Sequence, residues 1–93
     1  MRRYTFIWAD DDNIPHLAEH GVRPEEAEYV VEHADPENCS ISRTTGNPIA
    51  FGFTRADRYL AVIYWMVNET ENLVYVETAY DVPLRPGRRS NRS

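Results

Sequence analysis

Four side chains in this sequence have the chemistry of a site that transfers protons and binds anions: His20, Arg43, Arg58 and Tyr80. A histidine has an unperturbed pKa near ~6.5, so His20 can donate or accept a proton at neutral pH. Arginine binds phosphate or carboxylate oxygens with two parallel N–H groups. The structural alternative is that His20 interacts with the carbonyls at a helix end and that the arginines are solvated or paired with acids.

The sequence predicts no metal site and no cofactor. His16 and His20 are four residues apart, but there is no His-Glu-x-x-His motif and no third ligand. The acidic run Asp10-Asp11-Asp12 lacks the glycine and the glutamate of a calcium-binding EF-hand loop. Cys39 is the single cysteine, so it forms no disulfide within the chain.

Charge is distributed unevenly along the chain. The net charge is −5, every basic residue is arginine, and the last nine residues carry four of them, so the first 84 residues carry −9. An acidic body is a poor general surface for nucleic acid, because phosphate affinity depends on Lys and Arg. We therefore expect one domain over residues 1–84 and a basic, disordered tail over residues 85–93, the one stretch suited to phosphates.

The length of 93 residues suits one domain. No apolar segment follows Met1-Arg2-Arg3-Tyr4, which argues against a signal peptide. No stretch is long enough for a membrane-spanning helix, which needs about 20 apolar residues. These observations favour a cytoplasmic protein that does not enter a membrane.

The stretch Arg58–Val67 is the most apolar part of the chain and predicts the central strand. Read as a strand, it places Leu60 and Val62 on one face and Ile63 and Trp65 on the other, so both faces are apolar. We expect both faces to be covered, with Trp65 in the core. A buried helix is the alternative interpretation.

Two helices are expected before that strand. The first runs from Asn13 to His20 and ends at Gly21. The second begins at Pro24 and ends at Asp35-Pro36.

Four further stretches read as strands, and together with Arg58–Val67 they predict an α+β domain. These are Tyr4–Trp8, Asn38–Arg43, Ile49–Thr54 and Leu73–Tyr80. The predicted order is β-α-α-β-β-β-β. Short links between the last four strands favour an antiparallel sheet, with both helices packed on one face.

Several short motifs, spread over roughly residues 4–82, resemble the BrnT-type toxins of the RelE/ParE superfamily. The motifs are Phe6-x-Trp8, Leu17, His20-Gly21-Val22-x-x-Glu25-Glu26-Ala27, Arg43-x-x-Gly46-x-Pro48, Phe51-Gly52-x-Thr54, Arg58-Tyr59-Leu60 and Thr78-Ala79-Tyr80. This resemblance implies a RelE-like fold and a small ribonuclease that a cognate antitoxin protein inhibits. Cleavage by 2′-hydroxyl attack needs a proton acceptor, a proton donor and positive charge around the phosphate.

In such a site His20 transfers a proton, Arg43 and Arg58 hold phosphate oxygens, and Tyr80 donates a proton or stacks on a base. The candidate RNA-binding residues of the tail are Arg85, Arg88 and Arg89. The chain departs from the family pattern at Ala9, Asp12 and Tyr80, where an aspartate, a basic residue and an arginine are usual. Together with the acidic body, these departures leave a second hypothesis open: a non-catalytic module that keeps the toxin fold and binds a protein partner.

Overall fold

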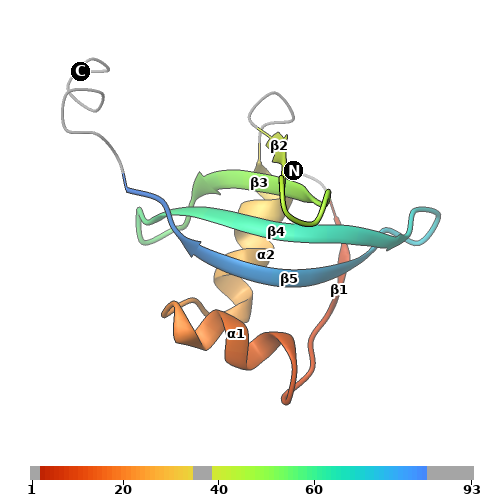
Figure 1. Ribbon diagram of the computed structural model, residues 1–93, viewed down its shortest axis with the longest axis horizontal. Coiled ribbons are helices and arrows are strands. Elements are labelled where there is room, and N and C mark those ends of the chain that lie inside the picture. Colours follow the sequence, from red (N-terminus) through yellow and green to blue (C-terminus); the bar gives the residue numbers. More distant parts are fainter. Residues whose placement is uncertain (1–2, 35–38, 84–93) are drawn as a thin grey trace.

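The computed structural model describes residues 3–34 and 39–83, and its elements follow the predicted α+β order (Figure 1). In chain order they are β1 (Thr5–Ile7), α1 (Asn13–Glu19), α2 (Pro24–His33), β2 (Cys39–Ile41), β3 (Pro48–Phe53), β4 (Tyr59–Asn68) and β5 (Leu73–Asp81). The strand interpretation of the apolar stretch is therefore correct. The predicted tail, with Arg85, Arg88 and Arg89, lies outside the described residues.

The five strands form one mixed sheet in the order β1-β5-β4-β3-β2. The four strands joined by short turns are antiparallel, as predicted. The expectation of a wholly antiparallel sheet is wrong for β1, which pairs with β5 in parallel, Phe6 opposite Val74. No hairpin constrains β1, because two helices separate it from β2, so its direction depends on tertiary packing.

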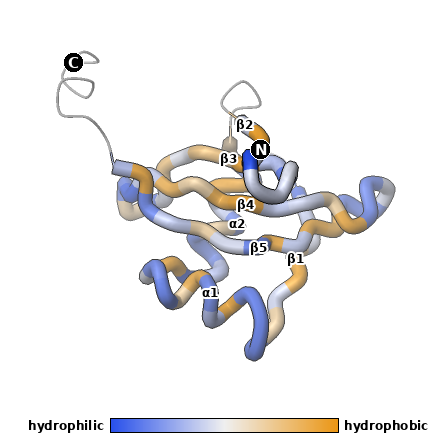
Figure 2. Tube along the Cα trace, in the orientation of Figure 1, coloured by the Kyte–Doolittle hydropathy of each residue, from blue (hydrophilic) through white to orange (hydrophobic). Residues whose placement is uncertain are grey.

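The core lies between the helices and the sheet face that carries Leu60 and Val62. The buried cluster draws on both helices and on three strands: Leu17, Val22, Ala27, Val30, Val31, Ala50, Leu60, Val62, Val74, Val76 and Ala79. Figure 2 shows hydrophobic colour along β3 and β4, and hydrophilic colour in the segment before α1 and in the turn between β4 and β5. Burial of these apolar side chains is the main stabilising term of the fold.

Two glycines lie beside this core, Gly21 after α1 and Gly52 in β3. Gly21 has a φ of 70°, and after it the Val22 amide donates to the Leu17 carbonyl at 2.9 Å, which ends α1 and buries Val22. Gly52 lies against Val30: a Cβ added to this glycine would be 3.5 Å from the Val30 Cγ1 atom. The predicted end of the first helix at Gly21 is confirmed, and the distance at Gly52 is that of an ordinary van der Waals contact.

The prediction that both faces of β4 are covered is wrong at Trp65. Leu60 and Val62 are fully buried, whereas Trp65 is 39% exposed and packs on Tyr75 with ring centroids 4.6 Å apart. The helices bury their apolar residues in the cluster on the Leu60 side, so the end of β4 that carries Trp65 keeps one face in contact with water. An apolar pattern on both faces of a strand does not by itself show that two layers cover it.

Asn13 anchors α1 to the sheet. This fully buried side chain donates to the carbonyls of Ile7 at 2.8 Å and Val76 at 2.9 Å, and its Oδ1 accepts from the Ala9 amide at 2.8 Å. A single amide thus joins β1, β5 and the start of α1, and its burial is compensated by three hydrogen bonds. No helix in the described part of the chain is long and apolar enough to cross a bilayer.

Candidate functional site

Arg58 is placed at the start of β4 by a tight turn that begins at Thr54. Thr54 is buried, and its hydroxyl accepts hydrogen bonds from the amides of Ala56 at 3.2 Å and Arg58 at 3.1 Å. The Thr54 amide donates to the Arg58 carbonyl at 2.8 Å, and Asp57 takes a positive φ of 68° to close the turn. Aspartate tolerates this left-handed conformation better than most residues.

The Arg58 guanidinium joins three elements through hydrogen bonds. Nε and Nη2 donate to the two carboxylate oxygens of Asp81 at 3.1 and 2.8 Å. Nη1 donates to the Gly21 carbonyl at 2.9 Å and to Glu26 at 3.2 Å. Hydrogen bonding to Asp81 raises the pKa of Arg58, and the same contact lowers the pKa of Asp81. These bonds leave at most one of the five guanidinium N–H groups for a phosphate oxygen.

His20 and Tyr80 lie beside Arg58 and Asp81, and we call these four residues the cluster. His20 ends α1, Tyr80 precedes Asp81 in β5, and their ring centroids are 6.1 Å apart. After the contact with Arg58, a protonated His20 is a smaller cause of the lowered pKa of Asp81. The structure therefore brings His20, Arg58 and Tyr80 together at one end of the sheet, where the α1–α2 junction meets β4 and β5.

Arg43 is the predicted site residue that the structure places elsewhere. It is exposed in the turn before β3, whereas Arg58 follows β3, so the two arginines flank opposite ends of that strand. Six strand residues span roughly 20 Å. Among the described residues, Arg43 makes no hydrogen bond or ion pair. Arg43 and Arg58 therefore do not lie together, because the length of β3 separates them.

Many residues of the toxin-like motifs have structural roles. Trp8 donates from Nε1 to Glu28 at 2.7 Å and so ties the end of β1 to α2. Val22 and Ala27 are buried in the core, and Glu26 pairs with Arg58. His20 is the motif residue here whose side chain is exposed and part of the cluster.

Sequence reasoning missed Glu26 and Asp81 as partners of Arg58. Glu26 lies in the first turn of α2, where acids are favoured, and accepts a hydrogen bond from the Arg23 amide at 3.0 Å. Asp81 follows the last predicted strand residue and carried no separate signal. The sequence contains one signal for these partners: Arg58 precedes an apolar strand in a chain with more acids than bases, so carboxylates are expected to pair with it.

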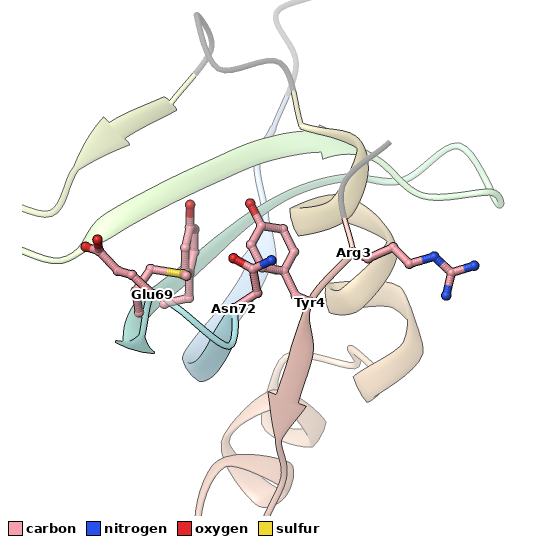
Figure 3. A pocket seen from close by; sticks show the side chains of 6 residues that line it. Arg3, Tyr4, Glu69 and Asn72 are labelled. Atoms are coloured by element: carbon pink, nitrogen blue, oxygen red, sulfur yellow. The ribbon is translucent and has the colours of Figure 1, made fainter.

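A pocket of about 570 Å³ lies at the other end of β5, where β1 begins beside the turn between β4 and β5. It is lined by Arg3, Tyr4, Tyr64, Met66, Glu69 and Asn72. Figure 3 shows Arg3 extending away from Glu69 and Asn72, so the charged groups do not converge on one point. None of the predicted site residues lines this pocket.

The cluster at the α1–α2 junction can transfer protons but carries little free positive charge. His20 and Tyr80 can exchange protons with a substrate, while Arg58 is largely committed to carboxylates. Within residues 3–34 and 39–83, no group of three or more His, Cys, Asp or Glu side chains is arranged to hold a metal ion. Comparison with protein-family models, with curated proteins and with solved structures finds no match to this chain.

Proposed function

We propose that this protein is a BrnT-like toxin of a type II toxin–antitoxin system, an RNA-cleaving enzyme of the cytoplasm that a cognate antitoxin holds inactive. The observation that carries the proposal is the meeting of His20, Tyr80, Asp81 and Arg58 at one end of the sheet. Of the four catalytic candidates that the motifs imply, three come from distant parts of the sequence to this place.

The architecture also supports the proposal. Two tandem helices bury their apolar residues with one face of a sheet whose last four strands form an antiparallel meander, as expected for a RelE-like fold. Fold alone does not determine activity, so the proposal depends on the residues of the cluster.

In the proposed reaction the 2′-oxygen of a ribose attacks the adjacent phosphorus, and the bond from phosphorus to the 5′-oxygen breaks. His20 accepts the 2′-hydroxyl proton, and Tyr80 donates a proton to the leaving 5′-oxygen. Positive charge must stabilise the pentacovalent phosphate. Carboxylates occupy most of Arg58, so at most one of its N–H groups is left for this role, and the tail residues Arg85, Arg88 and Arg89 are proposed to bind the RNA chain.

The test is inducible expression in bacteria with the growth rate as readout, followed by incubation of purified protein with cellular RNA. The wild type should arrest growth and cut RNA, and the His20→Ala and Tyr80→Phe variants should do so at least tenfold less well. His16→Ala is the matched control, since His16 lies in the same helix and is also exposed. Full toxicity of the His20→Ala/Tyr80→Phe double variant would exclude this site.

A non-catalytic protein-binding module is the second candidate function. The observation that favours it is the pairing of Arg58 with Glu26 and Asp81, which occupies the one arginine that lies in the cluster. If the wild type neither slows growth nor cuts RNA, while the purified protein is folded, this second function replaces the first.

A further inference from the structure

The sheet has a second face that the buried cluster does not use. Strand register places on this face every second residue of β3 and β4 and their partners in β5: Ile49, Phe51, Phe53, Tyr59, Ala61, Ile63, Trp65, Tyr75, Glu77, Thr78 and Tyr80. We call these eleven residues the open face. In Figure 1 neither helix lies in front of the sheet.

Aromatic rings dominate the open face and contact one another across strands. The rings of Phe53 and Tyr59 have centroids 4.7 Å apart, and those of Trp65 and Tyr75 are 4.6 Å apart. Trp65 is 39% exposed, and the adjacent Val67 is 48% exposed. The open face thus presents one exposed tryptophan among half-buried aromatic rings, and tryptophan and tyrosine carry much of the affinity at protein-binding sites.

Glu77 is the charged residue of the open face, and a strand irregularity puts it there. The register of β4 with β5 shifts between Ile63, opposite Thr78, and Tyr64, opposite Val76, so Glu77 has no partner in β4. Its Oε1 accepts from the Asn47 side chain at 3.0 Å, across β4. Glu77 is partly buried among aromatic rings, and a partner that covers its carboxylate removes the water that remains around it. This desolvation is unfavourable unless the partner supplies a cation that pairs with the carboxylate.

We infer that the open face binds a protein segment that presents one Lys or Arg to Glu77 and apolar side chains to Trp65 and Phe51. Three other ligands could cover this face: RNA, a second copy of the chain, and the stretch Arg85–Ser93. Their charge or composition fits the face less well than such a protein segment does. RNA would bring phosphates to a face that carries an anion and no cation. A second copy would bring another Glu77, and the stretch Arg85–Ser93 contains no large apolar side chain.

This inference rests on the protein-binding part of the proposed function and does not require RNA cleavage. It also suggests how a bound protein segment would inhibit the proposed enzyme. Tyr80 belongs to both the open face and the candidate catalytic cluster, so a segment that reaches Tyr80 covers the candidate site.

Selection from a random 16-residue peptide library on the immobilised full-length protein tests the inference. Recovered peptides should share a Lys or Arg flanked by apolar residues. Their affinity should fall at least tenfold for Glu77→Gln, which keeps an oxygen for Asn47 and removes the charge, and for Trp65→Ser. Ile41→Ser is the matched control, because Ile41 is 60% exposed in β2, outside the open face.

Several outcomes would overturn the inference: no enriched sequence, enriched peptides without a cation, or equal affinity of the wild type and Glu77→Gln. Binding of a uridine 12-mer that Trp65→Ser abolishes would assign the face to RNA instead. Self-association in sedimentation that Trp65→Ser abolishes would assign it to a second copy. Toxicity is measured separately on the same variants, so loss of peptide binding with intact toxicity distinguishes this surface from the proposed enzyme site.

Discussion

Arg58 and Asp81 form a two-pronged ion pair between the start of β4 and the end of β5, with N–O distances of 3.1 and 2.8 Å. The Asp81 side chain is 56% exposed, so this pair by itself contributes little in water. The contact of Arg58 with Glu26 is different, because the Glu26 side chain is 12% exposed. The cluster therefore has a stabilising role whether or not it has a catalytic one.

Arg58→Ala should lower the free energy of unfolding by about 1–2 kcal/mol, because it removes the cation paired with the mostly buried Glu26 carboxylate, which keeps only the Arg23 amide as a donor. Urea unfolding followed by circular dichroism measures the change. Arg43→Ala is the control and should stay within about 0.5 kcal/mol of the wild type, since Arg43 is exposed. Equal stability of the two variants would show that the ion pairs do not persist in solution.

Trp65→Ala should cost only about 1–2 kcal/mol of stability despite the size of the side chain, because Trp65 is 39% exposed and loses mainly its packing on Tyr75. Leu60→Ala, in the same strand but fully buried, should cost about 2–5 kcal/mol. Thermal unfolding of the two variants compares the faces of β4 directly. A loss at Trp65 as large as that at Leu60 would mean that both faces are covered in solution.

Asn13→Ala should destabilise the protein by at least about 2 kcal/mol, since it removes three hydrogen bonds to the backbone, of which the one to the Val76 carbonyl is buried and the other two are partly buried. Asn13→Asp keeps the oxygen that accepts from Ala9 but cannot donate to the two carbonyls when ionised. Its stability should therefore recover in part as the pH falls and the new carboxyl group is protonated. Urea unfolding at pH 4 and pH 7 checks both variants, and a pH-independent Asn13→Asp would contradict the bonding pattern.

Tyr75 should make the protein sensitive to alkali. Its hydroxyl donates to the Asp12 carboxylate at 2.6 Å, and this bond, followed by burial, raises the pKa of Tyr75 to about 12. The pKa of an unfolded tyrosine is about 10, so the folded state keeps its proton longer. The stabilisation by Tyr75 is thus fully present below pH 10 and is lost as the pH rises towards 12.

Unfolding of Tyr75→Phe between pH 8 and pH 12 measures this effect. The variant should be less stable than the wild type at pH 8 by about 0.5–1.5 kcal/mol, and the difference should close as the pH rises. Tyr80→Phe is the control, because within the described chain the Tyr80 hydroxyl makes no hydrogen bond. Parallel stability curves for the wild type and Tyr75→Phe would rule out the bond to Asp12.

Sequence alone was enough to predict the elements of this protein and their order. The helix stop at Gly21 and the apolar runs of the strands depend on residues close together in the chain, where backbone preference and periodicity act. His20 could be chosen as a candidate because its proton chemistry belongs to the residue type.

Tertiary structure decided what those residues contact. Glu26 and Asp81 lie 32 and 23 positions from Arg58, so strand register and helix packing, which no local pattern specifies, bring the three together. The parallel direction of β1 and the water-facing side of Trp65 depend in the same way on where the helices lie. An apolar residue type indicates that burial of its side chain is favourable. It does not specify which layer covers that side chain, because this layer comes from elsewhere in the chain or from a partner.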